Sequence, residues 1–361
     1  MKILRPISIL ASCLLLTAGA AAQISLTPPG AETPPAASKP AAKPKAKPPE
    51  VAKKPAASAA TPKPAATPAA PTATVTPAPA PDDPNVDLVF GAYQRGQYKT
   101  AFDLATKRAQ DSGDPKAMTM LGELYANAMG VKRDYAKAAD WYKRAADGGD
   151  REAMFALAML RLAGRGGPVN HEEAAKLLAS SAKLGNPKAA YNLALLYLDG
   201  QTLPQDVRRA AELFRVAADA GNPEAQYALA TFYKEGTGIE KDIGKAVRLL
   251  QAASLADNVD AEVEYAIALY NGTGTPKNEA AAVALLRKAA KQNSPIAQNR
   301  LARVLVSGQG APMDKIEGLK WHIVAKTAGK GDPMLDEALA ALSPEDRAKA
   351  EAAARRWLGT K

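Results

Sequence analysis

Residues 222–238 read NPEAQYALATFYKEGTG, and versions of this stretch recur along the chain every 36 residues. The copies align six times without a gap. One alignment column is alanine throughout, at Ala117, Ala153, Ala189, Ala225, Ala261 and Ala297. Another is glycine except in one copy, with Gly130, Gly166, Thr202, Gly238, Gly274 and Gly310. A fixed period of this length indicates a repeat architecture.

Each copy predicts two helices joined by a glycine-rich turn. In the quoted copy, Asn222 is a suitable N-cap with Pro223 at the first helical position, and apolar residues follow at helical spacing. Gly236 and Gly238 end this helix, because such a turn needs positive φ. Asp242 then caps the second helix. The equivalent caps are Asp114, Asp150, Asn186, Asn258 and Ser294 for the first helices, and Asp134, Asn170, Asp206, Asn278 and Asp314 for the second.

One helix pair cannot bury its apolar stripe alone, so neighbouring pairs must stack. A second small-residue column, Ala138, Ala174, Ala210, Ala246, Ala282 and Gly318, allows the crossing helices to approach closely. The sequence therefore predicts an all-α, right-handed helical-repeat solenoid. Its predicted parts are a degenerate leading repeat at 86–113, six helix–turn–helix units at 114–149, 150–185, 186–221, 222–257, 258–293 and 294–329, and C-terminal capping helices within 330–361.

The quoted stretch, followed by Lys245-Ala246 and Ala252-Ala253, resembles the Sel-one-like repeat (SLR), a relative of the tetratricopeptide repeat. The resemblance covers residues 114–329 and departs locally, since Arg161 and Leu269 stand where the family prefers tyrosine. It implies a non-catalytic scaffold that binds proteins, and first helices that line a concave face.

Carrying that geometry over places the fifth, ninth and twelfth residues from each first-helix cap on the concave face. The apolar and aromatic residues at these positions form the predicted partner-binding set: Phe155, Met159, Leu162, Tyr191, Leu195, Leu198, Tyr227, Val263, Ile267 and Tyr270. An exposed apolar band in a groove is typical of a binding site. The alternative is that the tyrosines at the fifth position are packed between helices.

The N-terminal segment predicts export. Residues 1–22 have a charged start, an apolar run and small residues at 20–22, so we expect a signal peptide cleaved before Gln23 and a periplasmic protein. Alternatively, Cys13 lies in a lipobox-like context and anchors a lipoprotein. Residues 23–85 are rich in Pro, Ala and Lys and predict a disordered spacer, which is either a plain spacer or a weak contact to anionic envelope polymer.

Composition limits the chemistry. The 361-residue chain has one Cys and two His, so we expect no catalytic residues, no metal site and no cofactor. The formal net charge of +10 comes without an aromatic and basic surface run, and we expect no nucleic acid partner. No segment after the signal is apolar enough to span a membrane. We expect a monomer.

These observations favour an exported, non-catalytic interaction scaffold, an adaptor or regulator in the cell envelope, that binds a protein or peptide segment in its concave groove. The alternative is an enzyme or accessory factor that acts on cell-wall polymer through a carboxylate site.

Overall fold

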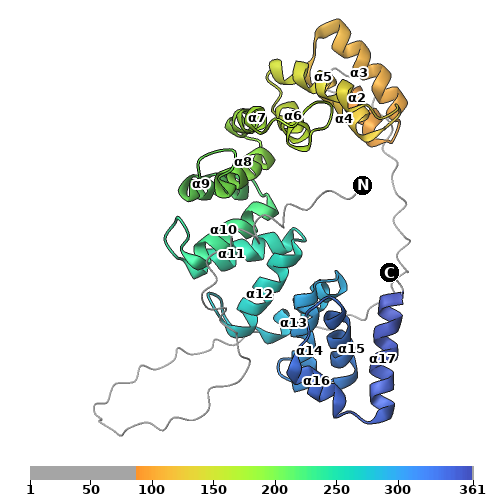
Figure 1. Cartoon of the computed structure of the whole chain (residues 1–361), viewed down its shortest axis with the longest axis vertical. Coiled ribbons are helices and arrows are strands. Elements are labelled where there is room, and N and C mark those ends of the chain that lie inside the picture. The colour runs from red at the N-terminus through yellow and green to blue at the C-terminus, as the bar shows by residue number, and fades with distance from the viewer. Residues whose placement is uncertain (1–86, 360–361) are drawn as a thin grey trace, which may run out of the picture. The chain divides into compact units, whose positions relative to one another are not determined.

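The computed structural model describes residues 87–359, which contain helices and no strands. The predicted signal, the spacer and the Cys13 alternative lie outside this range. Twelve helices, α4 to α15, form six pairs, and each of the twelve is thirteen residues long. The all-α repeat prediction is therefore confirmed. Figure 1 shows the helix pairs in chain order.

The bounds repeat with the period of the sequence. The first helices of the six units are α4 (Pro115–Asn127), α6 (Arg151–Ala163), α8 (Pro187–Asp199), α10 (Pro223–Glu235), α12 (Val259–Asn271) and α14 (Pro295–Ser307). The second helices are α5 (Tyr135–Asp147), α7 (His171–Lys183), α9 (Val207–Asp219), α11 (Ile243–Leu255), α13 (Glu279–Lys291) and α15 (Lys315–Thr327).

Local side-chain capping explains this regularity. All twelve predicted cap residues accept a hydrogen bond from a backbone N–H in the first turn of their helix. In the quoted copy, the N–H of Ala225 donates to Asn222 Oδ1 at 2.7 Å, and that of Lys245 donates to Asp242 Oδ1 at 2.8 Å. Each such cap satisfies one of the N–H groups that a helix start leaves without a partner.

The predicted glycine turns are confirmed. Gly166, for example, has φ of +73°, and a Cβ placed there would lie 2.1 Å from the carbonyl oxygen of Tyr135. This position therefore needs glycine both for its backbone conformation and for the close approach of the preceding unit.

Packing between units follows the order of the chain. Within a unit the two helices pack together, and each second helix also packs on the first helix of the next unit. The Ala117 and Ala138 columns are buried along their length. At Gly318 of α15, an added Cβ would lie 2.9 Å from Val306 Cγ2 of α14. The two helices are therefore too close at this point for a larger residue without a shift. The core is thus a series of clusters along the chain.

The two ends carry additional helices. Two N-terminal helices, α2 (Leu88–Gln94) and α3 (Tyr98–Ser112), precede the first unit, within the range of the predicted leading repeat. At the other end, α16 (Pro333–Ala340) and α17 (Pro344–Gly359) follow the last unit. Ser343 caps α17 by accepting a hydrogen bond from the backbone N–H of Asp346 at 3.1 Å. Trp357 of α17 packs edge-on against Trp321 of α15, with ring centroids 5.0 Å apart.

Candidate functional site

The predicted partner-binding residues differ widely in exposure. Tyr191, Leu195 and Val263 are buried, with 7 %, 7 % and 4 % of their surface exposed. Met159 is exposed, and the other six, Phe155, Leu162, Leu198, Tyr227, Ile267 and Tyr270, are partly buried. They do not form one continuous exposed band, because much of their surface packs into the clusters between neighbouring helices.

Two members of the set, Tyr191 and Tyr227, line one groove of about 380 Å³. The groove lies between α8, α10, the N-terminal end of α12 and the turn that leads into α14. We call it the Tyr–acid groove. The residues that define it are Tyr191, Glu224, Tyr227, Val259, Asp260 and Ile296.

The ring of Tyr191 is held firmly by its neighbours. It packs against Phe214 of α9 with a centroid separation of 5.6 Å, and Phe214 in turn packs against Phe232 of α10 at 5.5 Å. Aromatic pairs at these separations add to the stability gained by burial. Tyr191 is therefore a packing residue that also lines a groove, so both alternatives from the sequence apply to it.

Acidic side chains surround the two tyrosines. Burial and, second, the negative charge of Glu224 raise the pKa of Tyr191 to about 12. Burial and then the charges of Glu264 and Asp260 raise the pKa of Tyr227. Both phenols are therefore protonated at neutral pH, and each hydroxyl is able to donate and to accept a hydrogen bond.

Charge is not balanced across the Tyr–acid groove. Its lining includes Glu224, Asp257 and Asp260 and no lysine or arginine. Asp257 forms an ion pair with Lys288 of α13, in which Lys288 Nζ lies 2.7 Å from Asp257 Oδ1. Glu224 has no ion pair with any residue in 87–359. Sequence reasoning missed Glu224 and Asp260 because they lie in the first turns of α10 and α12, where acids commonly occur for helix stability alone. Asp257 lies in the turn before α12.

A second hollow, the N-terminal cleft, has a volume of about 350 Å³ and lies among α2, α3, α4 and the start of α6. Its lining is mainly apolar and includes Val89, Phe90, Tyr93 and Met120, and Phe90 is 48 % exposed. The sequence did not predict this cleft, because α2 lies outside the 36-residue register.

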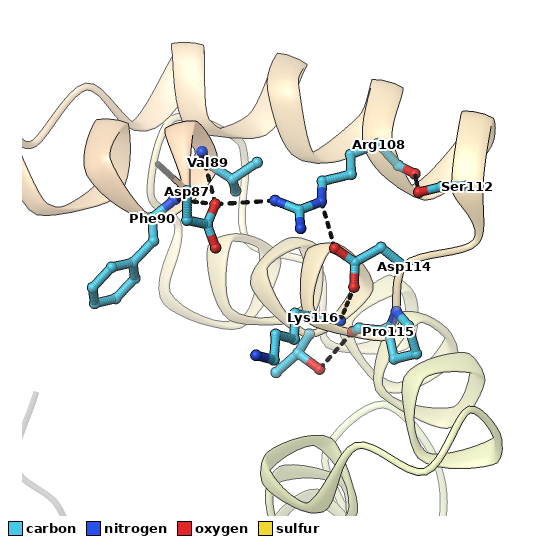
Figure 2. A network of polar contacts seen from close by, with 9 residues as sticks. Asp87, Val89, Phe90, Arg108, Ser112, Asp114, Pro115 and Lys116 are labelled. Carbon is cyan, nitrogen blue, oxygen red and sulfur yellow. Dashed lines mark hydrogen bonds and ion pairs between the residues drawn. The ribbon is translucent and has the colours of Figure 1, made fainter. Parts of the chain in front are cut away.

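Arg108 of α3 fixes one wall of the N-terminal cleft (Figure 2). Its Nη1 donates to Asp87, the cap of α2, at 3.2 Å, and its Nε contacts Asp114, the cap of α4. One guanidinium thus joins the starts of two helices. Since both carboxylates are already bound within the chain, this network is structural.

Within residues 87–359 no three His, Cys, Asp or Glu side chains are placed to hold a metal ion together. His171 begins α7, whereas His322 is buried in α15, four units further along. In the same range, no helix is long and apolar enough to cross a bilayer.

The Sel1 repeat model matches residues 115–150, 151–186, 187–222, 223–258, 259–294 and 295–330, each one residue later than the predicted unit. No curated protein matches the chain.

Two solved structures show the same repeat. A Sel1 repeat protein from Oxalobacter formigenes is 25% identical, with a TM-score of 0.59 over 66% of this chain and 98% of that one. A protective antigen with an SLR fold from uropathogenic Escherichia coli strains is also 25% identical, with a TM-score of 0.53 over 74% of this chain and 67% of that one. Because the six matches cover more than half of the chain, it belongs to the Sel1 repeat family, whose helical scaffold is typical of protein interaction.

Proposed function

We propose that this protein is an exported, non-catalytic scaffold of the cell envelope that binds a segment of a partner protein in the Tyr–acid groove. The observation that carries the proposal is the groove itself, about 380 Å³ in volume and lined by two tyrosines held in place by the repeat packing. Concave, partly apolar hollows with a few fixed polar groups are the usual form of a binding site. Export rests on the signal-like residues 1–22.

Site-specific photo-crosslinking in living cells tests this function. A photoreactive amino acid replaces Ile296, which lines the groove and is 45 % exposed, in the full chain. The control position is Val216 on α9, which is 50 % exposed and lies outside the groove. We expect a discrete protein adduct from position 296 and none from position 216.

Two other outcomes would count against the proposal. An adduct from Val216 alone would place the partner on the second helices. An adduct of cell-wall polymer at position 296 would instead support the alternative, an accessory factor for that polymer. Replacing Lys143 and Arg144 on α5, both exposed, should leave the adduct at position 296 unchanged.

A further inference from the structure

One arginine of the last repeat lies among charged neighbours without a partner of its own. Arg300 of α14 is partly buried, and its guanidinium forms no ion pair or hydrogen bond with any group in residues 87–359. Burial and, second, the positive charge of Arg303 lower the pKa of Arg300, and the negative charges of Glu264 and Asp332 offset this effect only in part. The folded chain therefore holds this positive charge at a net cost in stability.

The first of the two nearby acids, Asp332, is already occupied. It caps α16 and is buried, with 3 % of its surface exposed. One of its oxygens accepts hydrogen bonds from Arg303 Nε at 2.5 Å and from Asn299 Nδ2 at 3.4 Å. Its other oxygen accepts the backbone N–H of Met334 at 3.2 Å. Asp332 therefore has little capacity left for Arg300.

The second acid, Glu264 of α12, pairs with another cation. Its Oε2 lies 3.3 Å from Nζ of Lys234, which comes from α10. Lys234, Arg300 and Arg303 thus share only two carboxylates, and each carboxylate is bound to one of the other two cations. One positive charge is left over, and it belongs to Arg300.

The repeat fold does not require an arginine at this position. The equivalent residues of the other five units are Met120, Ala156, Asn192, Ala228 and Glu264, and none of them is basic. In all six units the first helix is nevertheless thirteen residues long and packs on its second helix. A side chain that costs stability and does not serve the repeat is typical of a functional position.

Arg300 lies next to the Tyr–acid groove. Ile296, which lines the groove, precedes it by four residues on α14, and residues four apart on a helix are neighbours on one face. The acids of the groove lie in or just before the first turns of α10 and α12, whereas α14 contains no acid. A segment that occupies the groove and continues along α14 therefore passes the guanidinium of Arg300.

We propose that Arg300 binds a carboxylate of the partner segment that occupies the Tyr–acid groove. The proposal rests on the proposed function and names the chemical group that this end of the groove recognises. A guanidinium suits a carboxylate, because its planar N–H groups donate two parallel hydrogen bonds to it. The pair would also neutralise a charge that the free protein leaves uncompensated. Both an acidic side chain and a chain terminus offer such a carboxylate.

Urea unfolding of the full chain tests whether Arg300 lacks an internal partner. Arg300→Met keeps most of the aliphatic stem and removes the charge, so its unfolding midpoint should equal or exceed that of wild type. Arg287→Met is the contrasting control, because Arg287 Nη1 lies 2.9 Å from Glu317 Oε1, and its midpoint should fall. A lower midpoint for Arg300→Met would show that the charge is already compensated within the chain, and would overturn the inference.

Photo-crosslinking from position 296 tests the site in cells. Arg300→Glu should lower the yield of the protein adduct about threefold or more, because the substitution replaces an attraction with a repulsion. Arg208→Glu is the matched control, since Arg208 is exposed on α9 and lies outside the groove, and it should leave the yield unchanged. Circular dichroism of the purified variants checks that both keep their helices.

The crosslinked segment itself provides the probe for the carboxylate. Mass spectrometry identifies the segment, and a labelled peptide of that sequence is measured by fluorescence anisotropy. Replacing its acidic side chains with amides should weaken binding to wild type by about threefold to tenfold and leave binding to Arg300→Met unchanged. Amidation of the C-terminus is the second arm, and a loss there instead would assign the chain terminus. If neither change weakens binding, the inference is wrong.

The two proposals fail in different ways. If position 296 forms a protein adduct that Arg300→Glu leaves unchanged, or that Arg208→Glu lowers equally, the inference fails and the proposed function stands. If position 296 forms no protein adduct, the proposed function fails and the inference fails with it.

Discussion

Nε2 of His322 lies 2.8 Å from Oδ1 of Asp336, and the same carboxylate oxygen accepts a 2.7 Å hydrogen bond from Lys326 Nζ. His322 is fully buried in α15, whereas Asp336 lies on α16. The contact therefore joins the last repeat to the first C-terminal helix. His322 is buried and His171 is exposed, so the buried histidine of the chain has a structural role here.

Replacing this acid should loosen the C-terminal helices in a pH-dependent way. Hydrogen bonds from Lys326 and then His322 lower the pKa of Asp336. Because the folded pKa lies below the unfolded value of about 3.9, the carboxylate stabilises the fold above that pH and loses its effect as pH falls through the folded value. Urea unfolding should show Asp336→Asn to be less stable than wild type at about pH 7 and nearly equal to it at about pH 2.

Glu337→Gln is the control for this experiment, since Glu337 is exposed on the same helix. An equal loss at both pH values, or the same loss in the control, would mean that the charge of Asp336 is unimportant.

Two turn glycines should differ in their tolerance of alanine. Gly149 has φ of +87° with no atom near an added Cβ, whereas Gly166 has φ of +73° and the Tyr135 carbonyl in the way. Gly149→Ala should cost about 1 kcal/mol through its backbone conformation alone. Gly166→Ala should cost a further 1–3 kcal/mol or so through overpacking. Equal unfolding midpoints would show that the preceding unit yields without cost.

Two substitutions of Tyr191 should show that its ring, and not its hydroxyl, contributes most to stability. Tyr191→Ala removes a buried ring from contact with Phe214 and should destabilise the fold by about 3 kcal/mol or more. Tyr191→Phe keeps that ring and should change stability by less than about 1 kcal/mol. Thermal unfolding of both variants checks this. A mild effect of the alanine variant would mean that the ring is less well packed than the structure shows.

Lys288 should stabilise the fold because it neutralises a buried carboxylate, that of Glu262. Glu262 has no exposed surface, and Lys288 forms an ion pair with it as well as with Asp257. Lys288→Met leaves the buried carboxylate unpaired and should cost about 2 kcal/mol, a value reduced because the lysine is 45 % exposed.

Adding Glu262→Gln to Lys288→Met should restore part of that stability, as a double-mutant cycle would measure. Lys291→Met, on the exposed part of the same helix, is the control. A purely additive cycle would argue against coupling of the pair.

Maturation tests the proposed export. N-terminal sequencing of protein purified from cells should begin at Gln23, which leaves a mature chain without cysteine. A lipid-modified start at Cys13 would instead make residues 23–85 a membrane tether.

The repeat architecture could be predicted because it depends on local signals. Asn222, Pro223 and Asp242 act within one helical turn, and a residue type at a fixed register position is enough to identify each role. Gly238 has φ of +69°, as expected from its place in the turn.

The groove could be predicted only in part, because it depends on how helices rotate against their neighbours. The position of Tyr191 and Tyr227 within the 36-residue repeat was enough to select them. The burial of Tyr191, however, depends on Phe214, which lies on a different helix, α9. Likewise, the approach of Glu224 to Tyr191 depends on how one unit stacks on the next. The N-terminal cleft requires Arg108 to join two helix starts, and no periodic pattern indicates such a contact.

The packing of each helix mainly against its chain neighbours also has a mechanical consequence. Tension applied to the two ends is transmitted through a series of similar interfaces, because no large central core carries the load. Small changes at each interface would add up along the series, so we expect the repeat region to lengthen under tension through many small movements. Since the groove is lined by four successive first helices, stretching would separate its two tyrosines and change the ligand that fits between them.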